Sequence, residues 1–141
     1  MSSFIDTSVL VAVFYGDHPA HDRCMDVFTQ LERHDSHCAA HTLAEFYAVM
    51  TRLPVKPRIS PDEVTLFWEA ITERLSAVTL SEREYVATLR EAAGRGISGG
   101  KIYDALILAC AKKCRAEAIY TLNHREFPVL APDLAGRIRT P

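Results

Sequence analysis

The feature that most constrains the fold of this chain is an alternation of short apolar segments with longer amphipathic ones. Short segments typical of β-strands lie at residues 3–6, 36–40, 76–80, 118–122 and 128–131. Segments with apolar residues at helical spacing lie between and after them, at residues 9–15, 19–33, 42–53, 61–74, 82–94, 102–114 and near 133–138. Strands that alternate with helices favour a parallel sheet with helices on both faces. The sequence therefore predicts an α/β fold with a central parallel sheet.

Hydroxyl residues mark several of the expected helix starts. Ser60 precedes Pro61 and Glu63, and Ser81 precedes Glu84, which are typical capping arrangements. Ser8 is expected to cap the helical segment that follows the first strand. The pair Thr42 and Glu45 also has capping-box spacing, which gives Glu45 an ordinary structural interpretation.

Length and composition are those of one globular domain, over residues 1–141. The chain is 48% hydrophobic and 24% charged, and no apolar run approaches the roughly 20 residues that span a bilayer. Its first residues lack the basic region of a signal peptide, so we expect a cytoplasmic protein without membrane association. The net charge of −2 means that nucleic-acid contacts would depend on local basic groups, such as residues 52–58 and 112–115.

Other common sites do not match the sequence. The cysteines form no C-x-x-C pair, and the histidines and cysteines show no zinc-finger spacing, which favours free thiols. The run GRGISGGKI at residues 94–102 resembles a phosphate-binding loop, but Arg95 and Ile102 replace the required glycine and hydroxyl residue. The first strand is followed by D-T-S, which lacks the second aspartate of haloacid-dehalogenase-type phosphatases.

Asp104 is the carboxylate that most needs an explanation. It shares a helix face with Ile107, Leu108 and Ala111, and an unpaired charge among apolar residues is costly. An aspartate at a helix start can simply interact with the helix dipole. Lys101 could pair with it, but an exposed ion pair contributes at most about 1 kcal/mol. A divalent cation would offset the charge more effectively.

Further oxygen-bearing side chains are expected near the same place. Asp6 ends the first strand and Asn123 follows the fourth, and ligands of α/β sheets bind beyond the carboxyl ends of the strands. Each residue alone could be a turn residue. Carboxylates that converge would repel one another unless a hard cation such as Mg²⁺ or Mn²⁺ bound between them. Such sites catalyse phosphoryl chemistry, in which the metal activates water and neutralises charge.

Four segments carry a resemblance to a known family. They are FIDTSVL at residues 4–10, LAEFYAVMTRL at 43–53, GGKIYDALILACA at 99–111 and YTLNHREF at 120–127. Through them the chain resembles, over nearly its whole length, the PIN-domain ribonucleases, and among these the VapC-type toxins of bacterial type II toxin–antitoxin pairs. The resemblance implies a single PIN-like domain with helices around a parallel sheet.

The resemblance also assigns site residues. It places the three acidic positions of the family on Asp6, Glu45 and Asp104, as catalytic residues and metal ligands. The fourth polar position, often an aspartate, falls on Asn123, which departs from the fully acidic set. Glu126, three residues further on, could substitute as a carboxylate.

The implied function is a Mg²⁺-dependent endoribonuclease, with Mn²⁺ as an alternative cofactor, that cleaves RNA phosphodiesters with metal-activated water. Ser8 would orient Asp6 or a water, and further substrate contacts are expected from Arg52, Lys56, Arg58 and Lys101. The resemblance further implies a cognate antitoxin as partner and a homodimer. The segments 9–33 and 61–74 carry large apolar residues that include Phe14, Tyr15, Phe67 and Trp68. Some of them are expected to form an exposed groove for an antitoxin segment, the alternative being that all belong to the core.

Two other functions remain open from the sequence. One is a non-catalytic PIN-like module that binds RNA or a protein. The other is a metal-dependent nuclease that acts on DNA or on structured substrates. The presence of all three acids argues against the first, and cleavage assays on RNA and DNA would decide the second.

Overall fold

A computed structural model describes residues 1–141 and contains one parallel sheet. Its strands are β1 (Ser3–Ile5), β2 (Ser36–Ala39), β3 (Ser76–Val78), β4 (Ala118–Tyr120) and β5 (Ile138–Arg139). The strand order is β3-β2-β1-β4-β5, and every neighbouring pair is parallel. The predicted fold class is therefore confirmed.

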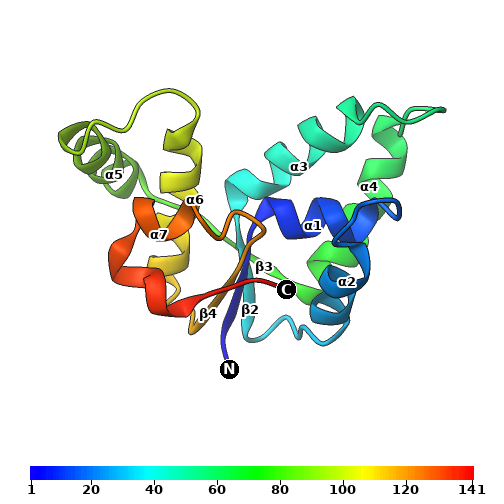
Figure 1. Ribbon diagram of the computed structural model, residues 1–141, viewed down its shortest axis with the longest axis horizontal. Coiled ribbons are helices and arrows are strands. Elements are labelled where there is room, and N and C mark those ends of the chain that lie inside the picture. Colours follow the sequence, from blue (N-terminus) through cyan, green and yellow to red (C-terminus); the bar gives the residue numbers. More distant parts are fainter.

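Helices cover both faces of this sheet (Figure 1). One side carries α1 (Thr7–Phe14), α2 (His21–Thr29), α3 (Ala40–Arg52) and α4 (Pro61–Arg74). The other side carries α5 (Glu82–Gly94), α6 (Lys101–Lys113), α7 (Phe127–Leu130) and the 3₁₀ helix η1 (Pro132–Arg137). None of the helices is both long and apolar enough to cross a lipid bilayer.

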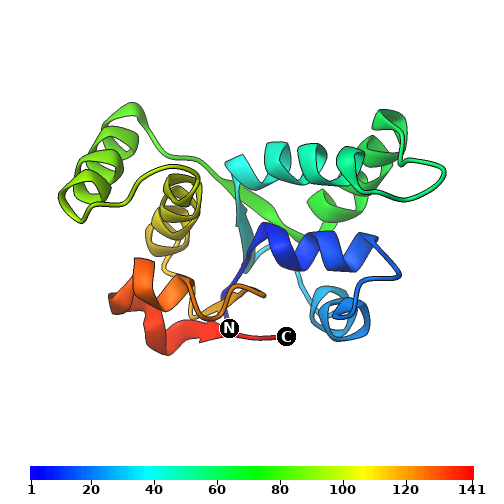
Figure 2. The ribbon, with the colours of Figure 1, turned by 45° about the horizontal axis from the view of Figure 1, so that its top comes forward.

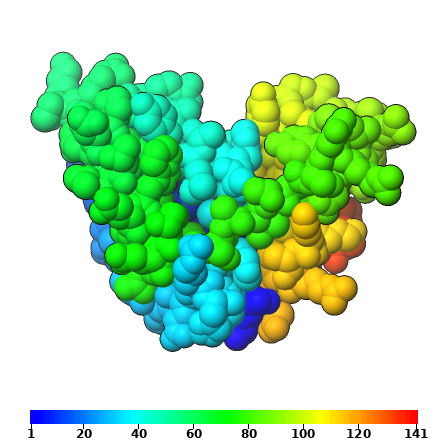
Figure 3. All heavy atoms as spheres, turned by 180° about the vertical axis from the view of Figure 1, so that it is seen from behind, coloured from blue at the N-terminus to red at the C-terminus, as the bar shows by residue number.

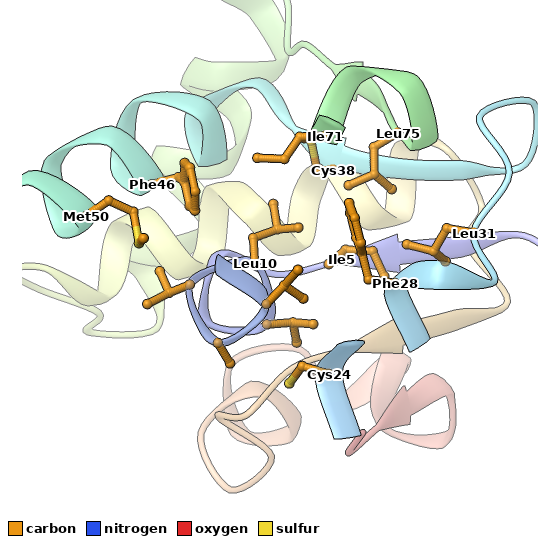
Figure 4. Packing of buried hydrophobic residues seen from close by; sticks show 14 of the residues in the cluster. Ile5, Leu10, Cys24, Phe28, Leu31, Cys38, Phe46, Met50, Ile71 and Leu75 are labelled. Atoms are coloured by element: carbon orange, nitrogen blue, oxygen red, sulfur yellow. The ribbon is translucent and has the colours of Figure 1, made fainter. Parts of the chain in front are cut away.

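Successive strand residues serve two separate hydrophobic cores, because side chains alternate between the faces of a sheet. Ile5 and Cys38 pack with the helices on the α1 side, in a cluster that also contains Leu10 and Phe46 (Figure 4). On the opposite face, a second core surrounds Phe4, packed among residues of α6, α7 and η1. The strands are thus covered on both faces, which explains their nearly continuous apolar character.

Two of the expected helix caps form and two do not. The capping boxes of Ser60 with Glu63 and of Ser81 with Glu84 are both complete. The prediction that Ser8 caps α1 is wrong, since the N-cap position is Asp6. The Thr42–Glu45 box is also absent, because α3 begins at Ala40, before Thr42.

The C-terminal segment differs from the prediction. Residues 128–131 were expected to form a strand, but residues 128–130 belong to α7, with Pro128 in its first turn, and Ala131 is the C-cap. Proline suits that position because it has no backbone N–H to contribute to a sheet. The expected helix near 133–138 is η1, and the fifth strand follows it at Ile138–Arg139, paired with β4.

The residues expected to form the aromatic groove are all half-buried, and most of them pack on other aromatic side chains. Phe14 stacks on Phe67 with ring centroids 4.9 Å apart and meets Phe46 edge-on at 5.7 Å. Trp68 stacks on Tyr47 at 5.7 Å. All cysteines are free thiols, as the sequence predicted.

Candidate active site

The sheet topology brings the ends of two distant segments together. β1 and β4 are adjacent and parallel, so Asp6 and residues 121–123 emerge at the same edge. The starts of α1, α3 and α6 surround this edge (Figure 2). The space-filling view shows the molecule hollowed between the α3–α4 side and the α5–α6 side (Figure 3). The candidate site is therefore an open cleft at the carboxyl end of the sheet.

Asp6 is the most buried acidic residue of the cleft, with only 2% of its surface exposed. The hydroxyls of Ser8 and Thr121 both donate to its Oδ2, at 2.7 and 2.9 Å. Burial raises the pKa of Asp6, the two hydroxyls oppose that shift, and the charge of Glu45 adds to it. Because both hydroxyls use Oδ2, the other oxygen, Oδ1, has no side-chain hydrogen bond and can bind a cation.

Thr121 is a site residue that the sequence analysis missed. Its hydroxyl donates to Asp6 and accepts a hydrogen bond from the backbone N–H of Asn123 at 2.9 Å. The Ser8 hydroxyl similarly accepts from the N–H of Leu122 at 3.0 Å. The only sequence signal was a hydroxyl residue two positions before Asn123. These bonds fix the loop after β4 against Asp6.

We predict that Ser8→Ala destabilises the protein by about 1 to 2 kcal/mol. The substitution leaves Asp6 with one hydroxyl donor and the N–H of Leu122 without its acceptor, and unpaired groups of this kind carry such a cost. Urea unfolding measures the change, with Ser98→Ala at an exposed position as the control. Equal stability of Ser8→Ala and the parent would show that the hydroxyl does not support Asp6.

Asp104 lies in the first turn of α6 and is half-buried. Burial and, to a lesser extent, the charges of Asp6, Glu45 and Glu126 together raise the pKa of Asp104 to about 6. The alternative ion pair with Lys101 does not form; no basic side chain lies within ion-pair distance of Asp104. The Asp104 carboxylate is thus surrounded by like charges and lacks a protein cation.

Glu45 lies in the second turn of α3 and has no capping role. Thr42, its expected capping partner, instead accepts a hydrogen bond from the buried hydroxyl of Thr7 at 3.0 Å. The nearest charged neighbour of Glu45 on its own helix is His41, whose Nε2 is 3.7 Å from the carboxylate. The ordinary structural explanation for Glu45 is therefore excluded.

The two candidates for the fourth polar position, Asn123 and Glu126, have different environments in the structure. The backbone carbonyl of Asn123 accepts hydrogen bonds from the N–H groups of Glu126 and Phe127, which places Asn123 at the start of a tight turn. Its side-chain amide makes no hydrogen bond within the protein. Glu126 is exposed, and its charge raises the pKa of Asp104. A carboxylate is therefore present beside the site despite the asparagine.

The oxygen atoms of these acidic side chains are the type of ligand that a hard divalent cation binds. Carboxylate oxygens are the ligands that Mg²⁺ and Mn²⁺ prefer, and the only basic group within ion-pair distance of these carboxylates is His41, beside Glu45. No three Asp, Glu, His or Cys side chains converge closely enough to form a ready-made metal cage. The carboxylates are therefore coupled by charge across an open cleft, without direct contact.

The basic residues expected to bind substrate lie in different places. Arg52 is at the end of α3, and since a helix rises about 1.5 Å per residue it is about 10 Å along the axis from Glu45. Lys56 and Arg58 are exposed in the loop beyond it, so the structure does not bring these three residues to the carboxylates. Lys101, by contrast, lies at the start of α6, one turn from Asp104.

The basic group at residues 112–115 is largely neutralised by ion pairs. Lys112 forms an ion pair with Asp133, and Lys113 pairs with Glu84, each at 2.7 Å. These pairs connect α6 to η1 and α5. Two of the three basic residues of the group at 112–115 are therefore occupied by structural contacts, and Arg115 is exposed.

Comparison with known proteins identifies the family. The model of the PIN domain family matches residues 3–131. Ribonuclease VapC27 of Mycobacterium tuberculosis is 35% identical over 114 residues, which cover 80% of this chain and 79% of that protein. Ribonuclease VapC40 of the same species is 33% identical over 114 residues, with 81% of each chain covered.

Solved structures share the fold. The crystal structure of M. tuberculosis VapC20, described as a Sarcin-Ricin loop cleaving toxin, superposes with a TM-score of 0.74 at 13% identity, covering 92% of this chain and 95% of that one. The VapBC2 structure from Rickettsia felis, bound to a promoter DNA fragment, gives a TM-score of 0.67 at 15% identity, covering 100% and 99%. With its sheet, its acidic cleft and these relatives, the chain belongs to the PIN domain family and is a VapC-type member of it.

Proposed function

We propose that this protein is a Mg²⁺-dependent endoribonuclease, the toxin of a toxin–antitoxin pair. The observation that carries the proposal is the set of like charges around Asp104, which raise its pKa and have no lysine or arginine partner. A protein keeps such an arrangement at a cost in stability, and a bound cation offsets it. The relatives VapC27 and VapC40 are named ribonucleases, which supports RNA as the substrate.

Each acidic residue has a distinct role in this proposal. Asp6, Asp104 and Glu45 hold the cation, with Mn²⁺ as an alternative, and Glu126 adds negative charge to the same cleft. When bound, the cation neutralises charge on the phosphate and activates water. Ser8 and Thr121 hold Asp6 in one orientation through its Oδ2. Asn123 can donate or accept through its free amide at the edge of the cleft.

A cleavage assay tests the proposal directly. The purified protein should cut single-stranded RNA oligonucleotides in Mg²⁺ or Mn²⁺ and should not cut them in chelator. DNA oligonucleotides of the same sequence should be cut much more slowly. Asp104→Asn, purified by the same procedure, is the control for a contaminating nuclease, because a contaminant would cut RNA in both preparations. Failure of the parent to cut any RNA in either metal would refute the proposed function.

Two competing functions predict other outcomes. A non-catalytic binding module would bind RNA without cutting it, and Mg²⁺ would not raise its melting temperature. A nuclease for DNA or structured substrates would prefer those substrates in the same assay. The carboxylates around Asp104 have no lysine or arginine partner, and they favour the catalytic function because a module without a metal has no use for them.

The basic loop yields a separate prediction. Replacing Lys56 and Arg58 by alanine should weaken RNA binding and flatten its dependence on salt, since each lost phosphate contact reduces the slope by about 0.7 for single strands. Because the loop lies far along α3 from Glu45, affinity for metal should not change. Fluorescence anisotropy over a salt series measures the slope.

The matched control for this prediction removes the same charge elsewhere. Arg83→Ala with Arg90→Ala changes two exposed arginines of α5 that form no ion pair. This control should leave the salt slope nearly unchanged. Equal slopes for the loop variant and the parent would place RNA binding on another surface.

Partner proteins are also part of the proposal. Exposed apolar residues follow one side of α5, at Tyr85, Val86 and Leu89, and Val129 of α7 is 69% exposed. Arg95, directly after α5, donates to the carbonyl of Val129, so the two helices are neighbours. These exposed apolar side chains support a protein partner, either an antitoxin or a second copy of this chain. Co-purification with the product of the reading frame immediately upstream, and the mass of the protein alone in solution, distinguish these partners.

A further inference from the structure

The cleft contains an aromatic pair to which the proposed chemistry gives no role. Tyr103 of α6 and His41 of α3 stack with ring centroids 5.0 Å apart and planes only 7° from parallel. Tyr103 is still 49% exposed although His41 covers one face of its ring. The hydroxyl of Tyr103 makes no hydrogen bond within the protein. A large aromatic ring is therefore presented to solvent at the edge of the cleft.

Both members of the pair are adjacent to acidic residues of the site. Tyr103 immediately precedes Asp104, and the Nε2 of His41 lies 3.7 Å from the carboxylate of Glu45. The pair thus spans the cleft between α3 and α6, beside the carboxylates. A flat ring at this position is within reach of a nucleotide whose phosphate lies at Asp6 and Asp104.

We propose that the Tyr103–His41 pair is a stacking platform for an unpaired RNA base next to the scissile phosphate. This inference rests on the proposed ribonuclease function and assigns to Tyr103 and His41 the contact with the base. Aromatic side chains bind splayed bases in this way, and the base must leave its own stack to expose its face. Tyr103 provides exposed ring surface for the base, and His41 stacks on one face of that ring. The platform would select single-stranded or looped RNA over a regular duplex.

Two alternatives to the platform make different predictions. The stack could only hold α3 against α6, in which case its loss would lower stability without a specific effect on RNA. The base could also enter a neighbouring hollow of about 160 Å³, whose mainly apolar lining includes His41, Leu106 and Tyr85. Tyr103→Leu and Tyr85→Leu separate these possibilities, because Tyr85 lines the hollow and Tyr103 does not.

The experiment measures binding of two strands that differ only in their bases. One is a labelled ten-nucleotide oligoadenylate, and the other is a ten-unit ribose-phosphate strand without bases. Binding is followed by anisotropy in the Asp104→Asn background, so that the strand stays intact. We expect Tyr103→Leu to weaken oligoadenylate binding about ten- to a hundredfold, the usual effect of losing one base–aromatic stack. Binding of the strand without bases should change less than twofold.

Additional variants identify the ring as the responsible group. Tyr103→Phe keeps the ring and should bind within about twofold of the parent. Tyr47→Leu removes a tyrosine of α3 that stacks on Trp68, and it should leave binding unchanged. Melting temperatures of all variants report any loss of fold.

The outcomes separate this inference from the proposed function. If the parent cuts RNA but Tyr103→Leu binds oligoadenylate as tightly as the protein that retains Tyr103, the platform is refuted and the ribonuclease function stands. Equal weakening of both strands would show a structural role, and loss of binding only in Tyr85→Leu would place the base in the hollow; either result overturns the platform. If the parent neither binds nor cuts RNA, the proposed function itself fails.

Discussion

Replacing Asp104 by asparagine is expected to reduce RNA cleavage by about a hundred- to a thousandfold without destabilising the metal-free protein. Loss of one preorganised charged or polar group from a reacting centre has a cost of that size. Asparagine keeps the shape of the side chain but removes the charge that holds the cation. Initial rates of RNA cleavage at saturating Mg²⁺ give the first half of the result.

The stability of the metal-free protein gives the second half. Asp104 is half-buried and faces the charges of Asp6, Glu45 and Glu126, so removing its charge relieves repulsion. The free energy of unfolding at pH 7 in chelator should be equal to that of the parent or higher by up to about 1 kcal/mol, the scale of the charge effect once solvent screening of a half-exposed group is allowed for. Mg²⁺ should raise the melting temperature of the parent and raise that of Asp104→Asn much less.

A first-turn aspartate away from the cleft provides the control. Asp62 is exposed in the first turn of α4, so Asp62→Asn tests the loss of a helix-start charge alone. That variant should lose a few tenths of a kcal/mol and cut RNA at the parental rate. If Asp104→Asn behaved in the same way, the assignment of Asp104 to a metal site would be wrong.

Apparent affinity for Mg²⁺ is expected to fall about tenfold between pH 7 and pH 5. The pKa of Asp104 is raised to about 6, so this carboxylate is mostly ionised at pH 7 and mostly protonated at pH 5. A proton on the carboxylate competes directly with the cation. The raised pKa of Asp6 adds to the fall in the same direction.

Stability without metal should change with the opposite sign. An acid whose pKa is higher in the folded state binds protons more tightly when folded, so this contribution is present at low pH and is lost as pH rises. For Asp104 the loss extends from about pH 4, near its ordinary pKa, through about pH 6. The stability advantage of Asp104→Asn over the parent should therefore be greatest at pH 7 and should decline as the pH is lowered through 6.

Two titrations measure these effects. Calorimetric titration with Mg²⁺ at several pH values follows metal affinity, and urea unfolding in chelator follows stability. The difference between the parent and Asp104→Asn isolates Asp104 from the other titrating groups. A metal affinity independent of pH between 5 and 7 would show that Asp104 is not a ligand.

Local sequence patterns were sufficient for most of the fold. Strand and helix periodicities depend on which faces a segment must bury, and these segments bury the faces that their patterns indicate. The capping boxes at Ser60 and Ser81 were also predictable, because donor and acceptor lie within one helical turn. The adjacency of Asp6 and Asn123 followed from parallel strands that end at one edge.

The C-terminal strand could not be predicted in the same way. β5 contains only Ile138 and Arg139, too few residues to show a period, and it exists because it pairs with β4. The apolar run at 128–131 has strand composition, but Pro128 suits the first turn of α7. Long-range pairing, not composition, decided which segment joined the sheet.

From the sequence, an oxygen-rich site could be predicted at the carboxyl edge of a parallel sheet, with Asp6, Glu45 and Asp104 as its expected acids. How these acids are supported depends on the tertiary structure. Ser8 and Thr42 have sequence contexts typical of helix caps, but partners brought close by the fold recruit their hydroxyls, because the same oxygen can accept from any donor that packing places beside it. For the same reason the coupling of Glu126 to Asp104, and the support of Asp6 by Thr121 from 115 residues away, depended on contacts that no local pattern records.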